Sequence, residues 1–141
     1  MNRELSFIII DDSELDCFVT QKFLERANRK LTIKVYQDAE QALELIRENK
    51  SEHNKLPNVI LLDLQMPGMS GFKFVEEFEK IPSEIQEKYA IIVLTVLSSS
   101  SDPKDIYNIL TFKTVKSVVE KPLTLEKLIS LLKHVPSAGD K

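Results

Sequence analysis

Three acidic residues follow directly after two apolar segments of the sequence. Asp11 and Asp12 come after the run at 7–10, and Asp63 comes after the run at 59–62. Unbroken apolar runs of this length are typical of strands buried on both faces, and parallel strands place their carboxyl ends at one edge of a sheet. Carboxylates gathered there would repel one another, unless a hard cation such as Mg2+ took their oxygens as ligands. The sequence therefore predicts a metal site built from acids.

The elements that must position these acids alternate along the chain. Runs of strand length lie at 5–10, 31–36, 59–62, 90–95 and 117–119. Apolar residues at helical spacing follow each run, at 15–23, 39–46, 74–78, 106–110 and 125–132. Strict alternation of strand and helix predicts right-handed crossovers. We therefore expect a doubly wound α/β fold, in which a five-stranded parallel sheet is covered by five helices.

Polar residues mark where several of these helices begin. Ser13, Asp38, Ser70 and Thr124 each precede a helical pattern and are predicted N-caps, because their side chains accept hydrogen bonds from free backbone N–H groups. Pro103 suits the first turn of the fourth helix, where its missing N–H has no cost.

Composition narrows the class of protein. A chain of 141 residues, 43% of them hydrophobic, is enough for one domain, which we expect to have its core at 5–134 and a short tail at 135–141. The net charge of −3 and the lack of a long basic run argue against direct binding to nucleic acid. With no signal peptide, no apolar stretch near 18 residues and no cysteine besides Cys17, we expect a soluble cytoplasmic protein without disulfides.

Two further residues lie where the sheet would place them beside the acids. Thr95 ends the fourth predicted strand, and Lys121 follows the fifth, directly before Pro122. In a doubly wound sheet the ligand site lies beyond the carboxyl ends of the strands. A hydroxyl and an ammonium both donate hydrogen bonds to the oxygens of a phosphoryl group, and the ammonium adds charge. The three acids, Thr95 and Lys121 therefore predict one phosphoryl-transfer site, with Asp63 as the acceptor.

Four motifs together resemble the receiver domain of bacterial two-component response regulators. They are IIIDDS at 8–13, LLDLQMPGMSG at 61–71, VLT at 93–95 and EKP at 120–122. Their order and spacing match the family, and the resemblance covers residues 5–134. It implies a flavodoxin-like fold with strand order 2-1-3-4-5. Because no DNA-binding or catalytic domain follows in this sequence, we expect a single receiver domain at 1–141 of the stand-alone type.

The resemblance also implies a role for each acidic residue. Asp63 would accept a phosphoryl group from a sensor histidine kinase or a histidine phosphotransfer protein, in a reaction that needs Mg2+. Asp12 and Asp63 would ligate the ion together with the backbone carbonyl of Gln65, while Asp11 would act largely through coordinated water.

By the same resemblance, Thr95 would bond a phosphoryl oxygen and Lys121 would pair with the carboxylate or the phosphate. The Lys121–Pro122 bond resembles the family's cis peptide. The protein would be a phosphoacceptor rather than a turnover enzyme. Its output would be a phosphorylation-controlled interaction with a downstream protein, a phosphorelay step or phosphorylation-dependent homodimerisation.

Some residues depart from the family pattern. Val118 stands where the family has Tyr or Phe, and Val96 replaces the small residue that follows the threonine. An alternative therefore stays open, a pseudo-receiver that binds a partner without phosphorylation. By the same resemblance, the residue two beyond the threonine flanks the path of the attacking water. Leu97 stands there and cannot orient a water molecule, which predicts slow self-dephosphorylation. An aspartate-nucleophile phosphatase would need an acid two residues after the nucleophile. This chain has Gln65 there, which argues against that alternative.

Other residues have simpler interpretations. Gly68 and Gly71 follow Pro67 and are typical of a turn rather than of a dinucleotide-binding loop. Cys17 is expected to be an inert semi-buried residue. For Phe18 we prefer a place in the core over a place in the docking surface for the phosphodonor.

Overall fold

A five-stranded parallel sheet forms the centre of the molecule. The computed structural model describes residues 5–27, 31–48, 58–66, 68–95, 103–121 and 123–132. The strands are β1 (Leu5–Ile10), β2 (Leu31–Tyr36), β3 (Asn58–Asp63), β4 (Tyr89–Thr95) and β5 (Val115–Glu120). They pair in parallel in the order β2-β1-β3-β4-β5, which confirms the predicted doubly wound, flavodoxin-like topology.

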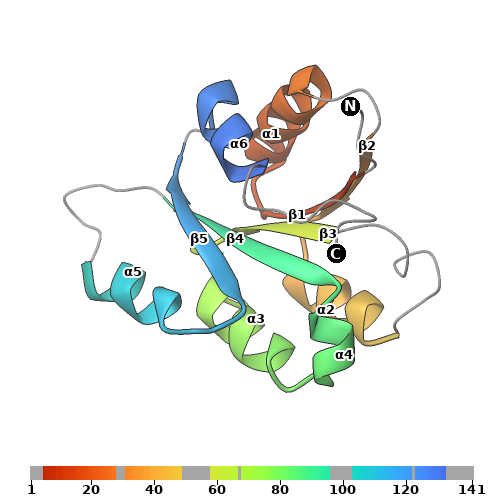
Figure 1. Cartoon of the computed structure of the whole chain (residues 1–141), viewed down its shortest axis with the longest axis vertical. Coiled ribbons are helices and arrows are strands. Elements are labelled where there is room, and N and C mark those ends of the chain that lie inside the picture. Colours follow the sequence, from red (N-terminus) through yellow and green to blue (C-terminus); the bar gives the residue numbers. More distant parts are fainter. Residues whose placement is uncertain are drawn as a thin grey trace.

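Helices cover both faces of this sheet. They are α1 (Glu14–Ala27), α2 (Ala39–Glu48), α3 (Gly71–Phe78), α4 (Ser83–Gln86), α5 (Pro103–Leu110) and α6 (Leu125–Leu132). Figure 1 shows α1 and α6 together on one face, with α2, α3, α4 and α5 on the other. The sheet is therefore the middle layer of three.

The strands contribute side chains to two separate hydrophobic cores, because successive side chains point to opposite faces of the sheet. Phe7 and Ile9 of β1 pack with α1 and α6, whereas Ile8 and Ile10 pack with the helices of the opposite face. All six residues of β3 are buried, since this central strand has helices above and below. The unbroken apolar runs in the sequence have their cause in this double coverage.

The predicted helix starts agree with the described contacts. Ser13 Oγ accepts from the N–H of Asp16 at 3.2 Å, and Ser70 Oγ accepts from the N–H of Lys73 at 3.2 Å. Asp38 and Thr124 accept in the same way, from backbone N–H groups two and three residues further on.

The helix α4 was not predicted. Five helices were predicted from the apolar spacing, and the described residues contain those five and this additional one. At four residues, α4 is a single turn, which is too short for a helical repeat of apolar residues to be visible. It follows Pro82 and buries Ile85, while Gln86 Nε2 donates to the carbonyls of Glu79 and Ile81.

The apolar spacing of α1 did not identify its buried face. Leu15, Val19 and Phe23 recur at helical spacing and predicted the helix, but Leu15 is 69% exposed. The side that faces the sheet instead carries three buried residues, Cys17, Thr20 and Leu24. Helical spacing was present on both sides of this helix, so periodicity alone could not select the buried one.

Candidate functional site

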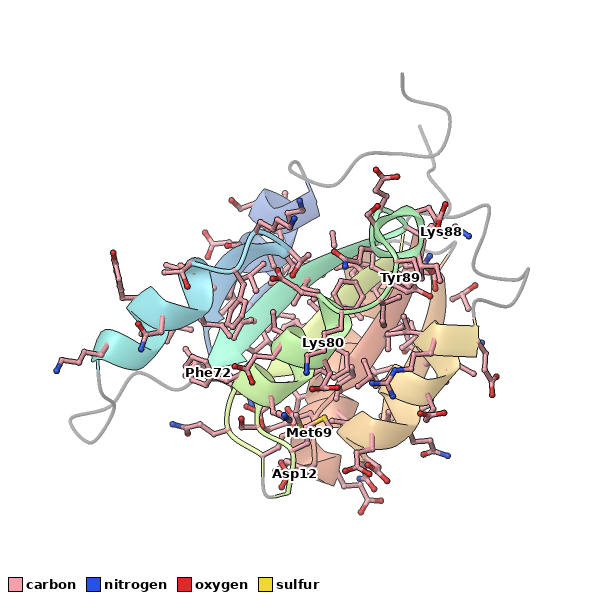
Figure 2. The ribbon with its side chains drawn as sticks, turned by 90° about the horizontal axis from the view of Figure 1, so that it is seen from below. Asp12, Met69, Phe72, Lys80, Lys88 and Tyr89 are labelled. Atoms are coloured by element: carbon pink, nitrogen blue, oxygen red, sulfur yellow. The ribbon has the colours of Figure 1, made fainter. Side chains whose placement is uncertain are left out.

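The three acids meet at the carboxyl edge of the sheet. Asp11 and Asp12 follow β1, Asp63 is the last residue of β3, and the register pairs Ile10 with Leu62. One carboxylate oxygen from each acid lies within 4.8 Å of the others. Asp11 and Asp63 are buried and Asp12 is exposed. Figure 2 shows Asp12 at the same end of the molecule as Met69, which lies in the loop after β3.

Backbone and side-chain contacts hold Asp11 in place. Its N–H donates to the carbonyl of Tyr36 at 3.1 Å, and its Oδ1 accepts from the N–H of Ser13 at 2.9 Å. The thiol of Cys17 donates to its carbonyl at 3.2 Å. Burial, and next the charge of Asp11, raise the pKa of this thiol to about 11, so Cys17 stays protonated at neutral pH.

Lys121 connects the acids to the far end of the sheet. Its Nζ lies 3.1 Å from Asp11 Oδ2, 3.3 Å from Asp63 Oδ1 and 3.0 Å from Asp16 Oδ2. Burial lowers the pKa of Lys121, but the hydrogen bond with Asp16 and the charges of Asp63 and Asp11 together outweigh it and raise that pKa above its ordinary value. The ammonium is therefore a permanent positive charge in the site.

The pKa of the Asp63 carboxyl is raised by its surroundings. Burial raises its pKa from 3.8 to about 6, the charge of Lys121 opposes this change, and the charge of Asp11 adds to it. The N–H of Gln65 donates to Asp63 Oδ1 at 3.3 Å. A carboxylate with its charge only partly compensated is suited to take up a cation and to act as a nucleophile.

Thr95 ends the neighbouring strand at the same edge. It is buried, with 3% of its surface exposed, and it pairs with Glu120 in the register of β4 and β5. Its carbonyl accepts from the N–H of Lys121 at 2.7 Å. The structure thus brings Thr95 and Lys121 together at the ends of adjacent strands, as the sequence predicted.

The loop after Asp63 depends on two glycines. Gly68 has a φ of 85°, in the left-handed region that glycine tolerates. A Cβ on Gly71 would lie 2.9 Å from Leu64 Cα, and the N–H of Gly71 donates to the carbonyl of Leu64 at 2.9 Å. Both glycines therefore shape the backbone, as their interpretation as turn residues requires.

An open pocket of about 390 Å3 lies beside Thr95, between α5 and β5. Its lining residues are Thr95, Ile106, Leu110, Lys116, Ser117, Val118 and Glu120. Val118, which stands at the family's aromatic position, is therefore a pocket residue. Its small side chain leaves this space open.

One prediction about an individual residue needs correction, and others fall outside the described part of the chain. Phe18 is 57% exposed, so the preferred place in the core was wrong. Lys22 Nζ lies 5.3 Å from the centre of the Phe18 ring. Val96, Leu97 and Pro122, and with Pro122 the predicted cis bond, lie outside the described residues.

Asp16 was not predicted to belong to the site. This residue belongs to the first turn of α1, and it reaches Lys121 across 105 positions of sequence. An available signal was its spacing, because a residue four after Asp12, at the start of a helix, lies near the same edge of the sheet.

Comparison with known proteins decides the family. Residues 7–133 match the family described as response regulator receiver domain. This chain belongs to that family. The receiver domain is 30% identical over 132 residues to the two-component response regulator ARR10 of Arabidopsis thaliana, covering 91% of this chain and 20% of ARR10. It is 26% identical over 121 residues to the probable methanogenesis regulatory protein FilR2 of Methanothrix harundinacea, covering 86% of this chain and 74% of FilR2.

Solved structures agree with this assignment. A response regulator receiver protein from Dyadobacter fermentans is 28% identical, with a TM-score of 0.79, and the match covers 92% of this chain and 96% of that one. A two component response regulator from Cytophaga hutchinsonii has the same TM-score at 22% identity, covering 95% and 97%, which supports the fold. None of the helices in the described ranges is long and apolar enough to cross a membrane.

The acids of this receiver domain fit a Mg2+ ion. Receiver domains bind Mg2+ through an acidic pocket, and the oxygens of Asp11, Asp12 and Asp63 lie within 4.8 Å of one another. Hard carboxylate oxygens are the ligands that this ion prefers. The exposure of Asp12 leaves a path by which an ion can enter.

We expect Val118→Phe to be tolerated, because the pocket beside it can hold the ring. The free energy of unfolding should stay within about 1 kcal/mol of the wild type. Val119→Phe is the matched control, since Val119 lies in the opposite, filled core with only 8% exposed. Overpacking there should lower stability by about 1 to 3 kcal/mol. Urea denaturation measures both, and equal losses would contradict a usable pocket.

Asp63→Asn should stabilise the metal-free receiver domain at neutral pH. The pKa of Asp63 is about 6 in the folded protein, compared with the ordinary value of 3.8. The folded protein therefore holds the carboxyl proton more tightly than the unfolded chain does. The contribution of Asp63 to the free energy of unfolding therefore falls as the pH rises from about 4 to about 6. An asparagine side chain does not ionise, so Asp63→Asn avoids this loss of stability. We expect a gain of about 1 to 3 kcal/mol near pH 7.5 and a smaller one near pH 4.5.

Urea denaturation in EDTA measures this difference, with exposed Glu76→Gln as the control for loss of a negative charge. An Asp63→Asn protein less stable than the wild type near neutral pH would contradict the argument.

Proposed function

We propose that this receiver domain accepts a phosphoryl group on Asp63 and acts as a phosphorylation-controlled switch or phosphorelay intermediate in two-component signalling. One observation carries the proposal. The buried carboxylate of Asp63 lies within 4.8 Å of two other acids and 3.3 Å from the ammonium of Lys121, at the carboxyl edge of the sheet. We propose it as a phosphoacceptor and not as a turnover enzyme, acting in the cytoplasm.

The reaction follows from the chemistry of these groups. An oxygen of Asp63 attacks the phosphorus of a phosphohistidine, the P–N bond breaks, and an acyl phosphate forms on the carboxylate. The Lys121 ammonium and the Thr95 hydroxyl donate hydrogen bonds to the phosphoryl oxygens. We propose that Asp12, Asp63 and the carbonyl of Gln65 hold the ion, with Asp11 acting through water. When bound, Mg2+ neutralises charge on the phosphoryl oxygens during in-line transfer.

The exposed apolar residues near the site favour a protein as phosphodonor. Leu15 and Phe18 of α1 are 69% and 57% exposed, and Leu125 and Ile129 of α6 are 38% and 48% exposed. The two helices lie side by side on one face (Figure 1). Exposed apolar residues gathered on neighbouring helices are typical of an interaction surface. We propose that a histidine kinase or histidine phosphotransfer protein binds here, beside the exposed Asp12.

A relative with a histidine kinase name supports this class of partner. The chain is 30% identical over 132 residues to the peroxide stress-activated histidine kinase mak1 of Schizosaccharomyces pombe, spanning 7% of that protein. The output side lies elsewhere, on α5, where Tyr107 and Leu110 are 72% and 50% exposed. A downstream protein or a second copy of the chain would bind there after phosphorylation.

The pseudo-receiver stays a second candidate because of Val118. The open pocket beside Thr95 lacks the aromatic side chain that the family uses for switching. Against this candidate, Asp11, Asp63 and Lys121 keep the contacts that phosphoryl transfer needs. We therefore prefer the phosphorylated switch.

Incubation with acetyl phosphate and Mg2+, followed by intact mass measurement, tests the chemistry. We expect the wild type to gain the mass of one phosphoryl group. Asp63→Asn should gain none, because the amide is not a nucleophile for this transfer. EDTA should abolish the gain in the wild type. A wild type that gains no mass would favour the pseudo-receiver instead.

Phe18→Ala tests the docking surface. The probe is a purified, phosphorylated histidine phosphotransfer domain that labels the wild type. We expect transfer to slow about tenfold, because truncating a buried interface aromatic removes a few kcal/mol of binding at most. Labelling by acetyl phosphate should not change, since Phe18 makes no contact with the acids in the described contacts.

Tyr107→Ala is the matched control, because Tyr107 is an exposed aromatic residue of α5, on the opposite face of the sheet. It should leave both rates unchanged. Equal slowing with the two donors would place the Phe18 effect in the fold of the site and not in docking.

A further inference from the structure

The ammonium of Lys121 has three hydrogen-bond donors and three carboxylate partners. Asp11, Asp16 and Asp63 lie 3.1, 3.0 and 3.3 Å from its Nζ. Among the described residues, the acids close enough together to share a metal ion are Asp11, Asp12 and Asp63, and Asp16 is not one of them. Asp16 is therefore the one partner of Lys121 that stands outside the acidic cluster.

This arrangement sets two demands on the same carboxylates. Asp11 and Asp63 are needed by a cation, yet both also contact a positively charged ammonium. Every hydrogen bond that Lys121 makes to them lowers their remaining negative charge and competes with the ion. A partner that attracts Lys121 from outside the cluster reduces this competition.

We propose that Asp16 is a positioning residue that holds Lys121 on the side of α1 and so keeps Asp11 and Asp63 available to a divalent cation. Asp16 is suited to this task by its place. It lies in the first turn of α1, its side chain is 44% exposed, and Ser13 caps its N–H. Its distance to Lys121 Nζ, 3.0 Å, is the shortest of the three carboxylate distances.

Removal of Asp16 changes the pairing of Lys121. The ammonium then has two carboxylate partners, and both belong to the acidic cluster. Its ion pairs with Asp11 and Asp63 become its only contacts with acids among the described residues. A cation must then displace Lys121 from both, which weakens its binding. The inference rests on the proposed function, because it takes the acids as a Mg2+ site.

Mg2+ affinity, measured by isothermal titration calorimetry, tests the inference on the full chain. We expect Asp16→Asn to weaken Mg2+ binding about fivefold, as the loss of one partly exposed ion pair beside the site predicts. Glu14→Gln is the matched control, because it removes the same charge from the same turn of α1. Screening by solvent should keep its effect below about twofold.

A double-mutant cycle separates positioning from simple attraction. In a Lys121→Ala background, Asp16→Asn should change Mg2+ affinity by less than about twofold, because the residue through which Asp16 acts is gone. Thermal unfolding of each variant shows that it is folded.

Three outcomes would overturn the inference. Asp16→Asn could bind Mg2+ as the wild type does, it could match Glu14→Gln, or it could lose as much affinity without Lys121 as with it. A wild type that binds no Mg2+ would overturn the proposed metal site as well, which distinguishes that failure from a failure of Asp16 alone.

Discussion

The buried negative charge at the carboxyl edge of the sheet is the constraint on which the rest of the site depends. Asp11 and Asp63 are 2% and 7% exposed, and one buried carboxylate next to another is unfavourable without compensation. The ammonium of Lys121 supplies part of that compensation through contacts with both. The raised pKa of Asp63, about 6, shows that the compensation is incomplete. A site poised in this way gains from any further positive charge that enters it.

The sheet makes such a site possible because hydrogen bonding continues beyond the strands. The N–H of Leu64 donates to the carbonyl of Leu94 at 2.9 Å, just after β3 ends. The N–H of Lys121 donates to the carbonyl of Thr95 at 2.7 Å, just after β5 ends. These bonds fix the backbone on both sides of Asp63 and Thr95. The side chains at these strand ends are therefore held by the rigid sheet.

The sequence predicted the parallel α/β layers and the meeting of the acids at one edge of the sheet for physical reasons, whereas the strand order came from the family resemblance. Central strands such as β3 have apolar residues throughout because both of their faces are buried. Parallel pairing then places Asp63 beside Asp11. Strand β5 was predicted too short, at 117–119, because this edge strand is only partly buried and its apolar signal is weaker. Phe18 was misplaced, and the buried face of α1 was not identified, because an apolar interaction surface and a core face have the same spacing. The spacing of Asp16 after Asp12 indicates only that it lies near the same edge, and its contact with Lys121 is a long-range pairing that this spacing does not specify.

The thiol of Cys17 gives the protein a built-in reporter of local opening. Cys17 is 4% exposed and its thiol donates to the carbonyl of Asp11, so a thiol reagent reaches it only when α1 separates from the end of β1. Because the chain has one cysteine, the labelling rate has a single origin. That rate would measure how often the acidic edge loosens, and a bound ion or a phosphoryl group that tightens the edge would appear as slower labelling.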